Sequence, residues 1–291
     1  MRKSLIKTLT LVLGAVFFAV LPAAAGTITI TGSTTVQPIA KTIAGDYMKA
    51  HPETRITISG GGSGNGIKAI IDGATDIGNA SRFIKDKELA YANGKGVYPV
   101  PFRVAYDCIV PIVHPSNAVK NLTISQLREI FKGTLKNWRD AGGEDGPIHV
   151  VSRDTSSGTY EVWESKVMNK EEVFPGVHLA SSNDEVLKAV MANPGAIGYI
   201  GLGYLENSVK ALTVENIKGA EATTINGSYP ISRPLFMFPR LAVRRNPGIP
   251  ELRLGARPGS GSREKSRFCR LVSERGTDFR QSRRGPGAEQ P

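Results

Sequence analysis

The sequence has 291 residues, of which 40% are hydrophobic and 22% are charged, and it contains 2 cysteines. This composition indicates a globular protein with one large or two medium domains, and it excludes a disordered or fibrous chain. Two cysteines cannot form a disulfide scaffold or a zinc ribbon. The formal net charge is +11 at pH 7, but residues 26–240 hold 22 basic and 21 acidic residues. Because this body is nearly neutral, we expect no nucleic-acid partner.

Residues 1–25 have the pattern of a secretory signal peptide. Three basic residues stand within the first seven positions, residues 9–21 are apolar, and three alanines precede Gly26. The apolar run is shorter than the roughly 20 residues that a membrane-spanning helix needs. We therefore expect an exported, periplasmic protein whose signal peptide is cleaved near Ala25.

Strand and helix patterns alternate along the rest of the chain. Runs typical of strands lie at 27–30, 55–58, 76–78, 108–113 and 148–152. Apolar residues at helical spacing follow Pro38, Gly66, Thr123, Thr159 and Asn183. Thr123 with Gln126 predicts a capping box, and Asn183 is the expected cap of the last of these helices. The alternation predicts an α/β protein with an open sheet.

Three of the predicted strands run into a turn rich in Ser, Thr and Gly that opens a helix. These turns lie at 33–35, at Ser63 within the glycine-rich loop 60–66, and at 157–159. A helix N-terminus presents unpaired N–H groups and a positive partial charge, so it favours an anion. Ligands of open α/β sheets bind beyond the carboxyl ends of the strands. One such turn is an ordinary helix cap, but three of them together with Arg153 favour an anion-binding site.

Other phosphate chemistries do not fit the sequence. The loop 60–66 lacks the Gly-Lys-Ser/Thr ending of a P-loop, because Ile67 and not a glycine precedes Lys68. The four histidines are scattered, without the helical pair of a zinc hydrolase, and the chain contains no Gly-x-Ser-x-Gly nucleophile motif. We therefore expect a protein that is not an enzyme, with no catalytic residues, no metal site and no cofactor.

Three segments, in this order, resemble motifs of the periplasmic phosphate-binding proteins, which are the substrate receptors of ABC phosphate importers. They are TGSTTVQP at 31–38, SGGGSGNG at 59–66 and DIGNASR at 76–82. Further matches lie at 130–133, 137–138, 153–159 and 195–199, so the resemblance spans about residues 27–238. It implies a type II periplasmic-binding-protein fold, with inorganic phosphate held between two lobes that hinge on each other. It also implies ABC permease membrane subunits as partners, and we expect a monomer.

The resemblance also implies a division of the chain. After the signal peptide, residues 26–105 would form the first part of lobe 1 and residues 106–197 would form lobe 2. Residues 198–240 would return to lobe 1. The chain would then cross between lobes near Val104-Ala105 and near 196–199.

Carried over by motif, the resemblance implies eight phosphate-binding residues. The first lobe would offer hydroxyl and main-chain donors, Arg153 would give a charge-assisted contact, and the second lobe would close the cage. The set is Thr34, Thr35, Ser63, Ser81, Arg153, Ser157, Gly158 and Thr159.

One position departs from some members of the family. These members place an aspartate where this chain has Ser81, and that carboxylate accepts the proton of hydrogen phosphate. Such an acceptor rejects sulfate, which has no proton to give. Asp107 is the nearest residue that could replace it as proton acceptor. Alternatively, the Asp107 carboxylate pairs with Arg82. Asp154 similarly either touches the ligand or orients Arg153.

Two other functions stay open at this point. One is a receptor for another oxyanion of the sulfate or molybdate class. The other is an exported phosphate-ester hydrolase, against which the lack of a nucleophile–base pair argues.

Residues 241–291 differ in composition from the body. They hold 1 Lys and 11 Arg, whereas residues 26–240 hold 14 Lys and 8 Arg. Pro and Gly become frequent and amphipathic periodicity fades. The segment is either a natural basic tail or the product of a reading-frame change, which we favour. We expect it to be largely disordered, which would leave part of the apolar surface of lobe 1 uncovered.

Overall fold

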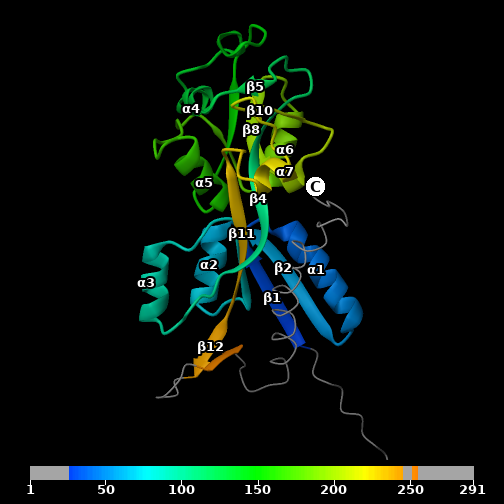
Figure 1. Cartoon of the computed structure of the whole chain (residues 1–291), viewed down its shortest axis with the longest axis vertical. Helices are drawn as coiled ribbons and strands as arrows, with labels where there is room; N and C mark the ends of the chain where they lie inside the picture. The colour runs from blue at the N-terminus through cyan, green and yellow to red at the C-terminus, as the bar shows by residue number, and fades with distance from the viewer. Residues whose placement is uncertain (1–25, 245–250, 255–291) are drawn as a thin grey trace, which may run out of the picture.

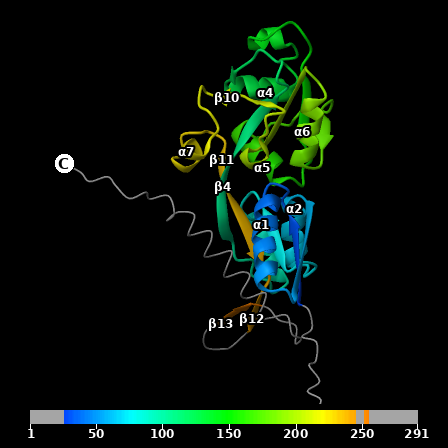
Figure 2. The same ribbon diagram turned by 90° about the vertical axis from the view of Figure 1, so that its right-hand side faces the viewer.

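The computed structural model describes residues 26–244 and 251–254, and it consists of two α/β lobes joined by two long strands (Figure 1). Strand β4 (Phe102–Val113) runs from the first lobe into the second, and β11 (Ser232–Pro239) returns antiparallel to it. The two strands lie side by side between the lobes (Figure 2). The expected signal peptide at 1–25 lies outside the described residues.

The first lobe is a sheet with helices on both faces. Its strand order is β2-β1-β3-β11-β4, in which β1 pairs in parallel with β2 and β3. Helix α1 packs on one face around Ile28 and Ile30, and α2 and α3 pack on the other around Ala80 and Phe238. The further elements are β1 (Gly26–Gly32), α1 (Gln37–Ala50), β2 (Thr54–Gly61), α2 (Ser63–Ile71), β3 (Ile77–Ala80) and α3 (Asp86–Gly94).

The second lobe is built around the far half of β4. Strand β8 pairs with β4, β6 pairs with β8, and β7 forms the edge, while the short β9 also pairs with β4. Its core includes Trp163 stacked on Tyr199 with ring centroids 4.2 Å apart. Its elements are β5 (Asn121–Leu122), α4 (Ile124–Lys132), η1 (Trp138–Ala141), β6 (His149–Arg153), α5 (Gly158–Lys166), β7 (His178–Ala180), α6 (Asn183–Met191), β8 (Ala196–Gly201), η2 (Leu202–Tyr204), β9 (Lys210–Ala211), β10 (Thr213–Val214) and α7 (Glu221–Ile225).

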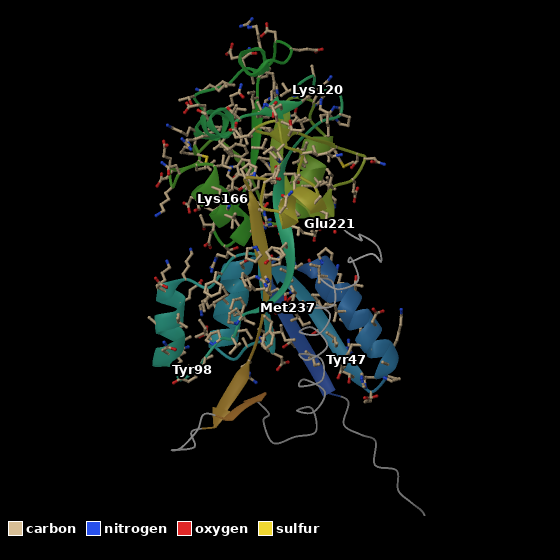
Figure 3. All side chains as sticks on the ribbon, in the orientation of Figure 1. Tyr47, Tyr98, Lys120, Lys166, Glu221 and Met237 are labelled. Carbon is tan, nitrogen blue, oxygen red and sulfur yellow. The ribbon has the colours of Figure 1, made fainter. Side chains whose placement is uncertain are left out.

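The second crossover differs from the position expected near 196–199. Strand β8 is buried along its whole length between β4 and β6, and the core of the second lobe extends to Ile231. Residues 198–231 therefore pack with the second lobe, and β11 carries the chain back. In Figure 3, Met237 of β11 lies in the first lobe, whereas Lys166 and Glu221 lie in the second. A buried apolar strand such as β8 fits either lobe equally well, so its sequence did not show which lobe it joins.

The helix caps follow the sequence in one case and differ in another. The capping box of α4 is confirmed, because Thr123 Oγ1 accepts the Gln126 N–H at 3.1 Å and Gln126 Oε1 accepts the Thr123 N–H at 2.9 Å. The cap of α6 is Ser182 and not Asn183, since Ser182 Oγ accepts the Glu185 N–H. The side chain of Asn183 is thereby left for contacts with the first lobe.

Only two short parts of the segment 241–291 are described. Strands β12 (Leu241–Arg244) and β13 (Glu251–Leu254) form an antiparallel pair separate from the main sheet. The expected disorder and the reading-frame hypothesis otherwise concern residues outside the described part. Within residues 26–244 and 251–254, no helix has both the length and the hydrophobicity to cross a membrane.

Candidate anion-binding site

The first lobe contributes four buried hydroxyl groups at the carboxyl ends of its parallel strands. Thr34 and Thr35 lie between β1 and α1, Ser63 is the first residue of α2, and Ser81 directly follows β3. The Oγ atoms of Ser63 and Ser81 are 3.2 Å apart, and the Ser81 N–H donates to Ser63 Oγ at 2.9 Å. Hydrogen bonds therefore join the two serines at the N-terminus of α2.

The second lobe contributes the turn between β6 and α5. Arg153 is the last residue of β6, and Ser157 is the N-cap of α5, where its Oγ accepts the N–H groups of Thr159 and Tyr160 at 3.2 and 3.3 Å. Asp154 holds this turn, because its Oδ1 accepts the Ser156 N–H at 2.9 Å. The carboxylate of Asp154 thus orients Ser156, whereas Arg153 takes its hydrogen-bond partners from backbone carbonyls.

Contacts across the two lobes bring these groups to one place. Thr35 Oγ1 lies 3.0 Å from Thr159 Oγ1, and the Gly64 N–H donates to the Ser156 carbonyl at 3.0 Å. A Cβ atom at Gly158 would lie 2.3 Å from Ser63 Oγ and 2.8 Å from Ser81 Oγ, so only glycine fits there. The lobes are therefore closed on each other, and the first-lobe hydroxyls meet the turn 156–159 of the second lobe.

Arg153 is buried and still has an unused donor. Its Nε donates to the Ala180 carbonyl at 3.0 Å and its Nη2 donates to the Ser181 carbonyl at 2.9 Å. Its Nη1 is buried without a hydrogen-bond partner among the described residues. Burial lowers the pKa of Arg153, but an arginine pKa starts so high that the side chain keeps its charge. An unpaired buried cationic N–H is costly and is the natural partner of an anion.

Asp107 has a different partner from the one that the sequence suggested. Its Oδ2 accepts from Nε and Nη2 of Arg233 at 3.0 and 2.8 Å, and its Oδ1 accepts the Leu202 N–H at 3.0 Å. Arg82 instead pairs with Glu88 and Glu161, so an Asp107–Arg82 pair is excluded. Burial raises the pKa of the Asp107 carboxyl, and the Arg233 guanidinium opposes that shift. A role for Asp107 as acceptor of a ligand proton stays a prediction.

Three residues close to the site were not identified from the sequence. Arg233 donates to both Thr35 and Thr159, Asn183 Nδ2 donates to Thr34 Oγ1 at 3.0 Å, and the Tyr204 hydroxyl donates to the Thr34 carbonyl at 2.6 Å. Of these three residues, Arg233 could have been noticed from the sequence. It interrupts the apolar alternation Ile231-x-Arg233-x-Leu235-x-Met237, whose four members are all buried.

The arrangement is rich in hydrogen-bond donors and carries a positive charge. Among the described residues, no group of three or more His, Cys, Asp or Glu side chains could hold a metal ion. What the site offers is hydroxyl groups, helix N-termini and a cationic N–H, which together suit a small oxyanion.

Comparison with known proteins agrees with this geometry. The model of the PBP superfamily domain matches residues 20–243. The phosphate-binding protein PstS of Bacillus subtilis is 35% identical over 209 residues, which cover 72% of this chain and 68% of that protein. This chain belongs to the periplasmic phosphate-binding protein family. The resemblance seen in the sequence is therefore confirmed, and the family match ends at residue 243, close to where the composition changes.

Solved structures of the family share the fold. A putative phosphate ABC transporter substrate-binding protein with bound phosphate from Clostridium perfringens has a TM-score of 0.72 at 32% identity, covering 88% of this chain and 97% of that one. An ABC-type phosphate transport receptor from Vibrio cholerae has a TM-score of 0.65 at 30% identity, covering 87% and 96%. These matches confirm the two-lobed type II periplasmic-binding fold.

Proposed function

We propose that this chain is an exported receptor that captures inorganic phosphate between its lobes and delivers it to an ABC-type membrane permease. The observation that carries the proposal is the buried, unpartnered Nη1 of Arg153, next to a turn that meets the first-lobe hydroxyls. The names of its relatives and the phosphate bound in the Clostridium perfringens structure support it. The signal-peptide pattern at 1–25 supports export.

We propose that the phosphate is bound by donors from both lobes, with Arg153 supplying the charge. Micromolar affinity corresponds to about 8 kcal/mol. Hydrogen bonds to a charged group contribute roughly 1.5–3 kcal/mol each, before the costs of association. Half a dozen donors therefore suffice. The proposed set is the one taken from the motifs: Thr34, Thr35, Ser63, Ser81, Arg153, Ser157, Gly158 and Thr159.

We further propose that the protein works as a monomer and binds its ligand without converting it. The family consists of substrate-binding proteins, and the groups at the site are donors that suit an intact anion. A receptor of this kind closes its lobes on the ligand. The contact between Oγ1 of Thr35 and Oγ1 of Thr159, at 3.0 Å, joins the two lobes in this way.

Calorimetry on the chain without residues 1–25 tests the proposal. Phosphate should bind with one site per chain, and sulfate or molybdate should bind more weakly. Tighter binding of sulfate or molybdate would instead identify a receptor for that oxyanion. Release of phosphate from a chromogenic phosphate ester, measured on the same sample, would contradict a purely binding role.

A further inference from the structure

A buried ion pair links the two strands that join the lobes. Arg233 of β11 and Asp107 of β4 stand directly opposite each other in the antiparallel ladder. Both Nε and Nη2 of Arg233 donate to Asp107 Oδ2, at 3.0 and 2.8 Å, and the two side chains are only 2% and 6% exposed. The guanidinium is therefore fixed in direction, because two of its donors are held by one carboxylate oxygen.

The same guanidinium reaches a hydroxyl in each lobe. Its Nη2 donates to Thr35 Oγ1 of the first lobe at 3.3 Å, and its Nη1 donates to Thr159 Oγ1 of the second lobe at 3.0 Å. These two hydroxyl oxygens are themselves 3.0 Å apart. Arg233 thus contacts both lobes at the point where they meet, although it lies on a connecting strand.

The number of lone pairs and protons on each group fixes the direction of these hydrogen bonds. A hydroxyl oxygen accepts two hydrogen bonds and donates one, whereas arginine only donates. Thr35 Oγ1 accepts from Arg233 and also from Asn183 Nδ2 at 3.2 Å. Which end of the Asn183 amide faces Thr35 is fixed, because its Oδ1 accepts the Gly201 N–H at 3.1 Å.

With both lone pairs filled, Thr35 must donate its own proton, and Thr159 Oγ1 is the neighbour in range. The donor that Thr35 offers to phosphate is then its main-chain N–H. Thr159 Oγ1 then accepts from both Arg233 and Thr35, so its proton is left to point elsewhere. The group is therefore a one-way chain of hydrogen bonds, from Thr35 to Thr159 and outward. Its end is a hydroxyl that donates and cannot accept.

We propose that Arg233, held by Asp107, is a positioning residue. It sets the direction of the hydrogen bonds between Thr35 and Thr159, so that the Thr159 hydroxyl donates its proton to the bound anion. This inference rests on the proposed function of the site. Because Thr35 and Thr159 belong to different lobes, this series of hydrogen bonds is complete only when the lobes are closed. The Arg233–Asp107 pair thereby ties closure of the lobes to the presentation of a donor.

The test compares Arg233→Lys with the wild-type chain. Lysine keeps the charge opposite Asp107, but its single ammonium group cannot hold Asp107, Thr35 and Thr159 in the fixed geometry of a guanidinium. We expect the variant to fold and to bind phosphate about 10- to 100-fold more weakly in calorimetry, as the loss of one or two charge-assisted contacts predicts. The matched control is Arg103→Lys on β4, an exposed arginine that lies over the Tyr106 ring. Its affinity should match the wild type.

A purely structural pair is distinguished by a double-mutant cycle. Thr159→Val should weaken phosphate binding strongly in the wild type but by less than threefold in Arg233→Lys, because the hydroxyl is already misdirected there. Thr159→Ser, which keeps the hydroxyl, should restore most of the affinity. Unchanged affinity in Arg233→Lys, or losses that simply multiply in the double variant, would overturn the inference. A wild-type chain that binds no phosphate would instead overturn the proposed function.

A second cycle applies if Arg233→Lys does not fold, as thermal melting would reveal. Thr35 acts through Thr159 in the chain of hydrogen bonds, so Thr35→Val combined with Thr159→Val should bind no more weakly than Thr159→Val alone. Losses that multiply in this pair would mean that Thr35 and Thr159 act independently, which contradicts the one-way chain.

Discussion

Arg82 of the first lobe and Glu161 of the second form an ion pair across the closed site, with Nε of Arg82 2.7 Å from Oε2 of Glu161. Lys85 contacts the same carboxylate oxygen at 2.7 Å. The pair adjoins the proposed anion site on both sides, because Arg82 follows Ser81 in the chain and Glu161 lies in the first turn of α5. Because its two partners belong to different lobes, we expect this pair to act as a latch that breaks when the lobes part.

Removing the latch should speed the release of phosphate. Glu161→Gln removes the ionic attraction of Glu161 for Arg82 and Lys85 but leaves Arg82 paired with Glu88. We expect phosphate affinity to fall about 3- to 30-fold, mainly through faster dissociation, as is usual for partly buried charge pairs. Stopped-flow fluorescence would measure the rates, with Glu164→Gln on the same helix as control. Equal dissociation rates in both variants would contradict the latch.

Glu88 predicts how stability depends on pH. Burial favours the neutral form of this carboxyl, but hydrogen bonds from Arg82 and Lys85 outweigh it, and the pKa of Glu88 is lowered in the folded protein. A lowered pKa contributes stability above the ordinary carboxyl value near 4.5, and that contribution is lost as the pH falls through the folded value.

The variant Glu88→Gln should therefore be less stable than the wild type at pH 7, by about 1 kcal/mol because the group is partly exposed. The difference should shrink as the pH falls below about 4.5. Urea unfolding at several pH values would measure it. A gap between the two proteins that stayed constant down to pH 3 would show that Glu88 contributes by packing and not by charge.

Local motifs predicted the turns that the structure brings together between the lobes, because each of them lies within a few residues of a recognisable strand end. Their contacts with phosphate stay a prediction. Thr35, Ser63 and Thr159 lie on turns that the sequence marks with small and hydroxyl residues. The chain order of these turns is enough to identify the family, and the fold then follows.

Long-range pairing was not predictable in the same way. Arg233 and Asp107 are 126 residues apart, and no local pattern shows that β11 lies beside β4. The same limit misplaced the second crossover, since β8 is an apolar run that suits either lobe. The only indication in the sequence was Arg233, a charged residue in an otherwise apolar alternation. Its position indicates that it has a buried partner, but it does not identify that partner.

Gly158→Ala should prevent closure without disturbing the fold. The added Cβ would lie 2.3 Å from Ser63 Oγ, yet alanine suits the first helical position of α5. We expect phosphate affinity to fall more than tenfold and small-angle scattering to show a more extended molecule in the presence of phosphate.

The control is Gly45→Ala in α1, where a Cβ meets nothing within 4 Å. That change should raise stability by about 0.5–1 kcal/mol and leave binding unchanged. Wild-type affinity in Gly158→Ala would show that phosphate binding does not need this close approach.

Arg153 should be the largest single contributor to phosphate affinity. Its Nη1 is buried without a partner in the described structure, and the rest of its guanidinium is held by the carbonyls of Ala180 and Ser181. Arg153→Gln removes the charge and the unpartnered N–H, so phosphate affinity should fall more than tenfold, corresponding to roughly 1.5–3 kcal/mol. The matched control is Arg128→Gln, because Arg128 also donates to a carbonyl of the second lobe, that of Val167 at 2.8 Å. Both variants should lose some stability in thermal unfolding, since Arg153 donates to two carbonyls and Arg128 to one, but only Arg153→Gln should lose affinity in calorimetry. If the two variants bind phosphate equally well, Arg153 is a structural arginine and the charge that holds the anion comes from another residue.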